Sequence, residues 1–186
     1  RDAMQACVDG ASNVAVGANT LDANTTGGEN VAVGNGALGA NTTASENTAI
    51  GYLSMTANTT GAHNVAIGHD SLKANTTGNY NIAIGRDAMQ ACVDGASNVA
   101  VGSNALDACV SGSNNVAIGD FALSAATGNA NTAVGHDAFN ACTTGANNVA
   151  IGYNSLDANT TANDNTAVGY NCMGANTTGA QNTAVG

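Results

Sequence analysis

The sequence predicts an all-β protein, a parallel β-solenoid of eleven coils of about seventeen residues each. Three observations predict it: a glycine that recurs every seventeen residues, an apolar pattern of period two inside each repeat, and turn-forming residues between the apolar segments. Internal periodicity takes precedence over other signals because it decides the architecture before any single element is assigned.

A five-residue segment of the type Asn-Val-Ala-Ile-Gly closes every repeat. Its glycine stands at Gly17, Gly34, Gly51, Gly68, Gly85, Gly102, Gly119, Gly135, Gly152, Gly169 and Gly186. Consecutive glycines are seventeen residues apart, except for one interval of sixteen in the eighth repeat. We expect residues 1–186 to form a single repeat region, and the first residue, Arg1 rather than Met, indicates an internal piece of a longer chain.

Composition excludes several classes of protein. Only 3% of the residues are aromatic, and Trp and Pro are absent, so the core of an ordinary globular domain is not expected. The apolar positions are nevertheless strictly periodic, which argues against disorder. Three basic residues against thirteen acidic ones leave no cationic stripe for a nucleic acid. No apolar run approaches twenty residues, so we expect no membrane insertion by this segment.

Each repeat contains two apolar patterns of period two. With Arg1 as position 1, position 4 is always Leu, Met or Phe, positions 6 and 15 are always Ala, and position 16 is always Val or Ile. Residues two apart share one face of a strand, so we expect two short strands, at about positions 3–8 and 12–16. The intervening Gly, Asn, Asp and Ser favour turns, and the abundance of Asn, Thr and Gly argues against helix.

Two strands and two turns make one coil, and coils that stack at about 4.8 Å give a rod of roughly 50 Å. We expect one inward ladder from Leu21, Leu38, Met55 and Leu72. We expect the facing ladder from Val16, Val33, Ile50, Ile67 and Ile84. The position-17 glycines suit a corner that needs positive φ or lacks room for a Cβ. The asparagines of position 13 suit a ladder of amide hydrogen bonds between coils.

The alanine of position 15 points opposite to its two β-branched neighbours. If those neighbours face the interior, the alanine row faces outward, where an unvarying small residue indicates close packing against another copy of the chain. The predicted contact row is Ala15, Ala32, Ala49, Ala66, Ala83, Ala100, Ala117, Ala133, Ala150, Ala167 and Ala184. In the competing arrangement the alanines lie inside the coil, and the row of Val101 faces the partner chain.

The unit Asn-Val-Ala-Ile-Gly or Asn-Thr-Ala-Val-Gly, followed by two variable residues and then Ala-Leu or Ser-Leu, resembles the head repeats of trimeric autotransporter adhesins. It is also similar to repeats in phage tail-fibre and surface-fibre proteins, and the resemblance covers every repeat. It implies a left-handed parallel β-roll and a side-by-side homotrimer. Coils of that family are usually about fourteen residues long, and here the extra residues fall in the Ala-Asn-Thr-Thr-Gly segment.

The resemblance implies a structural, non-enzymatic fibre segment of a trimeric surface adhesin or phage tail fibre, extracellular, serving attachment to a host or surface. Its partners would be two further copies of itself and a host receptor or glycan. An alternative is a ligand-binding head that contacts glycan or receptor by its own flank. A third reading, an ice-binding solenoid, comes from the threonine rows. We expect no cofactor, and no catalytic set of residues is evident.

Several side-chain groups are candidates for binding. Aromatic or cationic ladders at position 1 would offer a platform for a sugar: Tyr52, His69 and Arg86, then His136, Tyr153 and Tyr170. Glu29, Glu46 and His63 share position 12 on consecutive coils and would suit a cation, although a solvated charged row is the commoner explanation.

Other groups favour a structural interpretation. Glycosylation sequons begin at Asn24, Asn41, Asn58, Asn75, Asn159 and Asn176, but turns and a threonine ladder explain them better. Four of the five cysteines, Cys7, Cys92, Cys109 and Cys142, occupy position 7, and Cys172 stands at position 3. Cys92 and Cys109 fall on adjacent coils, within disulfide reach, although scattered substitution in a ladder is the favoured interpretation.

Overall fold

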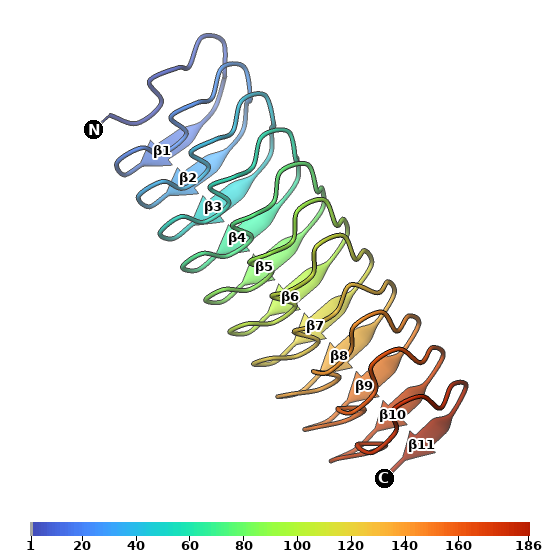
Figure 1. Ribbon diagram of the computed structural model, residues 1–186. Coiled ribbons are helices and arrows are strands. Elements are labelled where there is room, and N and C mark those ends of the chain that lie inside the picture. Colours follow the sequence, from blue (N-terminus) through green and yellow to red (C-terminus); the bar gives the residue numbers. More distant parts are fainter. Residues whose placement is uncertain (1) are drawn as a thin grey trace.

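The computed structural model describes residues 2–186, so Arg1, the first residue of the first predicted coil, lies outside it. The chain is a β-solenoid in which every repeat contributes one strand, and residues 2–186 contain no helix (Figure 1). The strands are β1 (Val14–Val16), β2 (Val31–Val33), β3 (Thr48–Ile50), β4 (Val65–Ile67), β5 (Ile82–Ile84), β6 (Val99–Val101), β7 (Val116–Ile118), β8 (Thr132–Val134), β9 (Val149–Ile151), β10 (Thr166–Val168) and β11 (Thr183–Val185).

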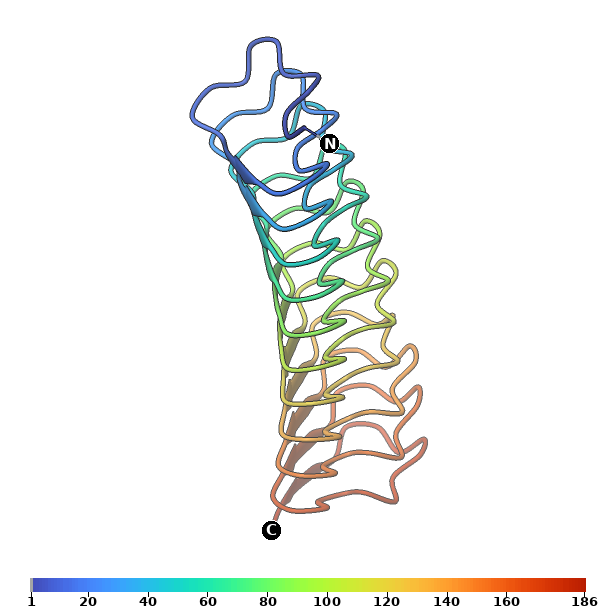
Figure 2. The same ribbon diagram turned by 90° about the vertical axis from the view of Figure 1, so that its left-hand side faces the viewer.

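The strands form one parallel sheet in chain order, without a shift in register. Each position-15 alanine pairs with the alanine of the next coil, as Ala15 does with Ala32. Even the sixteen-residue eighth coil keeps this register, because Val116 pairs with Thr132 and the missing residue falls in the turn before the strand. The coils therefore stack into a rod with its two termini at opposite ends (Figure 2).

Only one of the two predicted strands exists. Positions 12–16 contain the strand at positions 14–16, whereas positions 3–8 form successive turns. Positions 2 and 4 lie in the left-handed region of φ, as Asn19 (54°) and Leu21 (49°) illustrate, and this bends the chain away from an extended course. Turn hydrogen bonds close it, as when the Asn24 N–H donates to the Leu21 carbonyl at 3.2 Å. The prediction of a strand over positions 3–8 was wrong.

The core is a column of large apolar side chains packed against a column of alanines. Leu21, Leu38, Met55 and Leu72 are fully buried, which confirms the first predicted ladder. The second ladder was wrong: Val16 is 56% exposed and Ile50, Ile67 and Ile84 are each 37% exposed. The interior is narrow, since the Ser54 hydroxyl at position 3 donates to the strand carbonyl of Ala66 at 3.0 Å. A strand side chain larger than a methyl group has no room there.

The corner glycines and the asparagine ladder follow the prediction. All eleven position-17 glycines have positive φ, and a Cβ on Gly102 would lie 2.5 Å from the Gly119 carbonyl oxygen of the next coil. At position 13, the Asn47 backbone N–H donates to Asn30 Oδ1 at 3.0 Å, and Asn30 Nδ2 donates to the Ala44 carbonyl at 2.9 Å. The buried Asn30 amide thus links its own coil to the next one and has partners for both of its polar atoms.

Candidate interaction surface

The sheet presents its β-branched residues to solvent and its alanines to the core. The alanines from Ala32 to Ala167 are fully buried, and only Ala15 and Ala184, on the first and last coils, are partly accessible. The predicted contact row therefore lies inside the coil, and the expectation that it faces outward was wrong. The alanines instead lie inside the coil, as the competing arrangement has them, and Val101 and its equivalents stand on the outer face.

The outer face of the sheet, formed by positions 14 and 16 of all eleven coils, is apolar along its whole length. Of its 22 residues, 18 are Val or Ile and four are Thr, so it carries no charge. Three residues on each of eleven strands cover about 500 Å² in projection. Parallel sheets are normally covered on both faces, and monomers rarely expose apolar patches beyond a few hundred Å².

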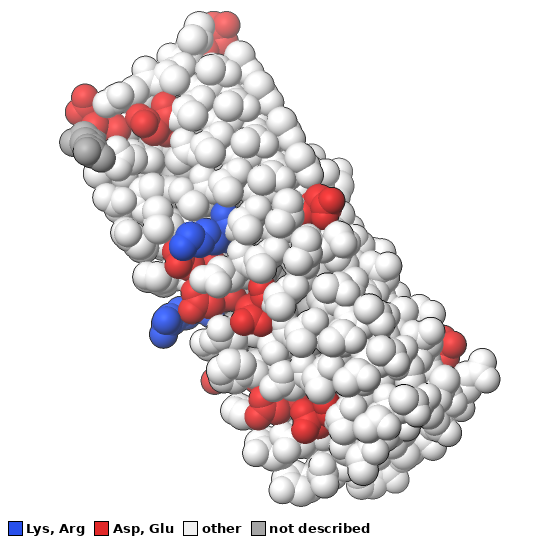
Figure 3. Space-filling view, viewed as in Figure 1, with Lys and Arg blue, Asp and Glu red and all other residues white. Residues whose placement is uncertain are grey.

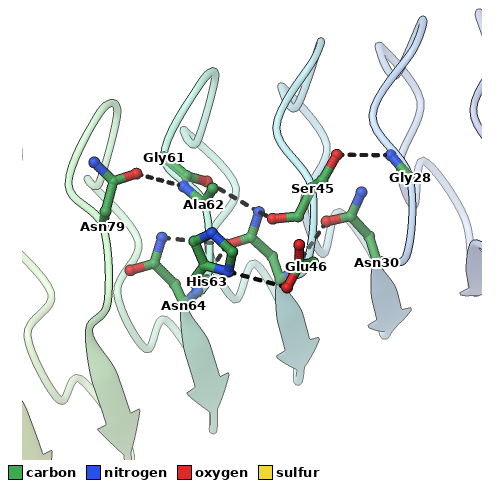
Figure 4. Close-up of polar contacts among 10 residues, drawn as sticks. Gly28, Asn30, Ser45, Glu46, Gly61, Ala62, His63, Asn64 and Asn79 are labelled. Atoms are coloured by element: carbon green, nitrogen blue, oxygen red, sulfur yellow. Dashed lines mark hydrogen bonds and ion pairs between the residues drawn. The ribbon is translucent and has the colours of Figure 1, made fainter.

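Position 12, at the start of each strand, carries a polar and aromatic row. The His63 ring lies 3.1 Å from the Glu46 carboxylate through Nδ1 (Figure 4). The same ring stacks on Tyr80 with ring centroids 4.8 Å apart. Beside this row, the Ala62 N–H donates to Asn79 Oδ1 of the next coil at 2.7 Å, and the Gly28 N–H donates to Ser45 Oγ at 3.0 Å. The sequence does not predict the stack of His63 on Tyr80. It groups Glu29, Glu46 and His63 as possible cation ligands, and the next residue of the row, Tyr80, is not one.

Position 1, after the corner glycine, carries the predicted ladders of rings. Tyr52 stacks on His69 at 5.1 Å, His136 on Tyr153 at 5.5 Å, and Tyr153 on Tyr170 at 5.5 Å. The ladders are confirmed as stacks, while the proposed sugar platform is less favoured by their geometry. A sugar packs on the open face of a ring, and in a stack the faces cover one another and leave mainly edges in water.

The side chain of Arg86, the third member of the first ladder, lies beside a carboxylate. Its Nε is 3.1 Å from Asp87 Oδ2. One coil earlier, Lys73 Nζ lies 2.9 Å from Asp70 Oδ2, so both buried aspartates have cationic neighbours. Figure 3 shows these basic groups beside acidic ones at one edge of the rod, while most of the face in view carries no charge.

Metal-ligand geometry occurs at one place in residues 2–186, and it is not the predicted one. His69, Asp70 and Asp87 have ligand atoms within 4.8 Å of one another, whereas Glu29, Glu46 and His63 form no such group. The two aspartates already face Lys73 and Arg86, which would compete with a cation for the carboxylate oxygens. The sequence pattern missed this set because its members come from positions 1 and 2 of neighbouring coils.

The asparagines of the glycosylation sequons form a second buried ladder. Asn41, Asn58 and Asn75 each donate from Nδ2 to the Oδ1 of the preceding coil, at 2.9, 3.0 and 2.8 Å. Since Asn24, Asn41, Asn58, Asn75 and Asn159 are fully buried, the structure favours the turn interpretation over a glycan. The two threonines that follow each asparagine have different roles. Thr25 Oγ1 donates to the Thr42 carbonyl at 2.9 Å, while Thr26 is exposed.

The outer threonine row bears on the ice-binding reading. Its members at position 9 are Thr26, Thr43, Thr60, Thr77, Thr144, Thr161 and Thr178, all exposed. Asp94 and Ser111 interrupt it, and the eighth coil has no residue at this position. The row is therefore a single broken column of hydroxyl and methyl groups rather than a flat array.

Cysteines interrupt the second asparagine ladder. Cys92, Cys109, Ala126 and Cys142 take its place on four consecutive coils and are fully buried. The amide groups at the two borders lose their partners: Asn75 Oδ1 and Asn159 Nδ2 are buried without a hydrogen bond. Burial raises the pKa of the Cys142 thiol to about 12. All five cysteines are present as free thiols.

The surface of residues 2–186 has no pocket. Nor do these residues contain a helix with the length and hydropathy that a bilayer span requires. No protein-family model matches the sequence, and the searches of curated proteins and of solved structures found no match.

Proposed function

We propose that this chain is a structural, non-enzymatic segment of an extracellular fibre, an adhesin or a phage tail fibre, in which three copies pack side by side. One observation carries the proposal: the sheet places 18 Val and Ile residues on its outer face along the whole rod. Burying that face against neighbouring chains removes it from water, at about 25 cal/mol for each Å² of apolar surface.

The number of chains and the attachment role rest on the resemblance to trimeric adhesin heads and fibre repeats. Three flat faces directed at a common axis would close a symmetric assembly and leave no apolar face exposed. The contact surface is the outer face of the sheet, in place of the alanine row. Each chain would contribute the same row of Val and Ile side chains, and the polar turns would face water.

The oligomeric state tests the proposal directly. Sedimentation equilibrium should give three times the chain mass of 18.0 kDa. Replacing two outward residues, Ile84→Gln and Val101→Gln, should yield a monomer that keeps its β-type far-UV spectrum, because both side chains are accessible in the single chain. The matched control Gln90→Glu lies in the turn region and should stay trimeric.

Two results would contradict the proposal. One is sedimentation of the unmodified chain as a folded monomer at tens of micromolar, and the other is a double variant that stays trimeric. For the alternative functions, retention of this chain alone on a glycan array would favour the flank-binding head. Thermal hysteresis in the presence of ice crystals would favour the ice-binding reading.

A further inference from the structure

Two cysteines occupy the same position on adjacent coils. Cys92 belongs to the sixth coil and Cys109 to the seventh, and both side chains are fully buried. Each sulfur lies over the turn that follows it: Cys92 Sγ is 3.9 Å from the Gly95 carbonyl oxygen, and Cys109 Sγ is 3.3 Å from that of Gly112. The two thiols therefore occupy equivalent sites, one coil apart.

Side chains at this position touch across coils from the second coil to the fifth. There the asparagine amide of one coil bonds to that of its neighbour, as from Asn75 Nδ2 to Asn58 Oδ1 at 2.8 Å. Backbone bonds keep the sixth and seventh coils at the same spacing on both sides of the cysteines, from Ala91 N to the Asp107 carbonyl and from Val93 N to the Val110 carbonyl, each 2.8 Å. Stacked coils place equivalent Cα atoms about 4.8 Å apart.

That spacing lies inside the Cα–Cα range of disulfides, about 4.4–6.8 Å. Among the other cysteines, Cys142 is separated from Cys109 by the coil that carries Ala126, which puts it at roughly twice the spacing. Cys7 and Cys172 lie on the first and last coils. We propose that Cys92 and Cys109 are a disulfide site that covalently joins the sixth coil to the seventh in an oxidising compartment.

The bond needs an external oxidant, and a low-molecular-weight disulfide such as oxidised glutathione suffices. The thiolate of one cysteine attacks a glutathione sulfur and forms a mixed disulfide, releasing one glutathione thiolate. The second cysteine loses its proton and attacks the protein-side sulfur, releasing the second glutathione. Two protein thiols are thereby oxidised to one disulfide, and one glutathione disulfide is reduced to two glutathione molecules. Because both thiols are buried after stacking, the exchange occurs while the chain folds.

In the stacked coils the two thiols have different electrostatic environments. A hydrogen bond donated by the Cys92 thiol stabilises the Cys109 thiolate and lowers the pKa of Cys109. The same contact, together with burial, raises the pKa of Cys92. In the folded, reduced chain Cys109 is therefore the first of the two thiols to ionise.

Refolding under defined redox conditions tests the site. The chain is unfolded in denaturant, then refolded either with dithiothreitol or with a mixture of reduced and oxidised glutathione, and free thiols are counted after denaturation. We expect five thiols from the reduced sample and three from the oxidised one. Cleavage before aspartate should then give one linked pair, residues 87–93 joined to residues 107–119, which separates on reduction.

The oxidised protein should also melt several degrees higher, because the bond restricts the unfolded chain between coils. Cys109→Ser should abolish both the linked pair and the shift in melting temperature, whereas the matched Cys142→Ser should keep them. Five free thiols after oxidative refolding to a normal β-type spectrum would overturn the proposal. A mixture of linkages without preference for this pair, or a linked product without β structure, would also overturn it.

Discussion

At the scale of single residues, the fold depends on which side chains fit inside a very thin coil. The strand contributes only a methyl group to the core at position 15, and the opposite wall contributes one Leu, Met or Phe at position 4. Many of these residues adopt left-handed backbone conformations, including Leu38 at a φ of 51°. Such conformations cost about 1–2 kcal/mol each for residues other than glycine, and packing between the coils must offset this cost.

The alanine row is the most sensitive part of the core. Ala100→Gln should unfold the chain rather than separate its copies, because the site is fully buried and filled by the opposite wall. Overpacking and an unpaired amide together cost more than about 3 kcal/mol. Chemical denaturation followed by far-UV circular dichroism measures the loss. Ala108→Gln, on an exposed turn alanine, is the matched control and should leave the midpoint nearly unchanged.

The interrupted asparagine ladder predicts a stabilising substitution. Cys142→Asn would give the orphaned Asn159 Nδ2 an acceptor and place a donor beside the Gly145 carbonyl, the partner that Cys142 Sγ now has at 3.6 Å. Restoring one buried hydrogen bond should raise the free energy of unfolding by about 1 kcal/mol. Cys142→Ala, which fills the site without amide groups, should not stabilise. Equal stability of the two variants would contradict the ladder explanation.

Two half-buried carboxyl groups make stability depend on pH. Burial raises the pKa of Asp107, and burial together with the charge of Asp137 raises the pKa of Asp157. A raised pKa means that the folded chain holds the proton more tightly than the unfolded chain does. The contribution of these two groups to stability should therefore be full below the unfolded-state pKa of about 3.9 and should be lost as pH rises through the folded-state pKa.

Asp107→Asn should remove part of this dependence. At pH 7 the variant should melt above the unmodified chain, and the gap should close as the pH approaches 3.5. Asp94→Asn, at an exposed site, controls for the general loss of negative charge. A gap that is the same size for both variants at all pH values would show that net charge, and not burial of this group, is responsible.

At the scale of the coil, each element is too small to be stable alone and depends on its neighbours. The first coil (residues 2–17) and the sixth (residues 87–102) have identical sequences, yet Met89 and Cys92 are fully buried while Met4 and Cys7 are only partly so. Only the number of neighbouring coils differs. Stability in stacked repeats comes largely from the interfaces between neighbours, so equal sequences need not be equally stable.

This pair of identical coils allows an internal comparison. In the 186-residue chain, backbone amides of residues 14–16 should exchange with solvent faster than those of residues 99–101, because the first coil pairs on one side only. Mass-spectrometric hydrogen exchange on peptides from the two coils measures the difference. Indistinguishable protection would mean that coil stability is intrinsic and not set by stacking.

Coil length, the Leu and Met column, the corner glycines and the asparagine ladder could all be predicted, because each leaves a fixed residue type at a fixed spacing. The orientation of the strand could not. Alternation at Val14, Ala15 and Val16 defines two faces of the strand but does not say which face is inward. Hydropathy favoured placing the larger, β-branched residues inside. Only the width of the coil decides, and it is fixed by turns at positions 2 and 4. The sequence does not reveal these turns, because leucine at position 4 is not a residue type that indicates positive φ.

At the scale of the whole molecule, the candidate site is the outer face of the sheet, formed by positions 14 and 16. The turns at positions 2 and 4 make the coil so narrow that these residues lie outside it. With the alanines inside, the rod has a flat apolar side along its full length and polar turns elsewhere, which suits lateral packing of copies. Stacked rings at the strand ends reinforce contacts between coils along the same direction. Residues 2–186 are thus organised along a single axis, with repeated contacts between successive strands and none between distant strands.

That one-dimensional order has a mechanical consequence. A load applied between the two termini acts along the axis on which the coils are stacked, so an isolated chain should lose its coils one after another rather than all at once. Each detached coil of seventeen residues would lengthen the chain by roughly 50 Å. Stretching between an optical trap and a surface should therefore show a staircase of nearly equal extensions. Three chains packed side by side would share the load at every step, so a fibre of this kind would yield gradually under drag.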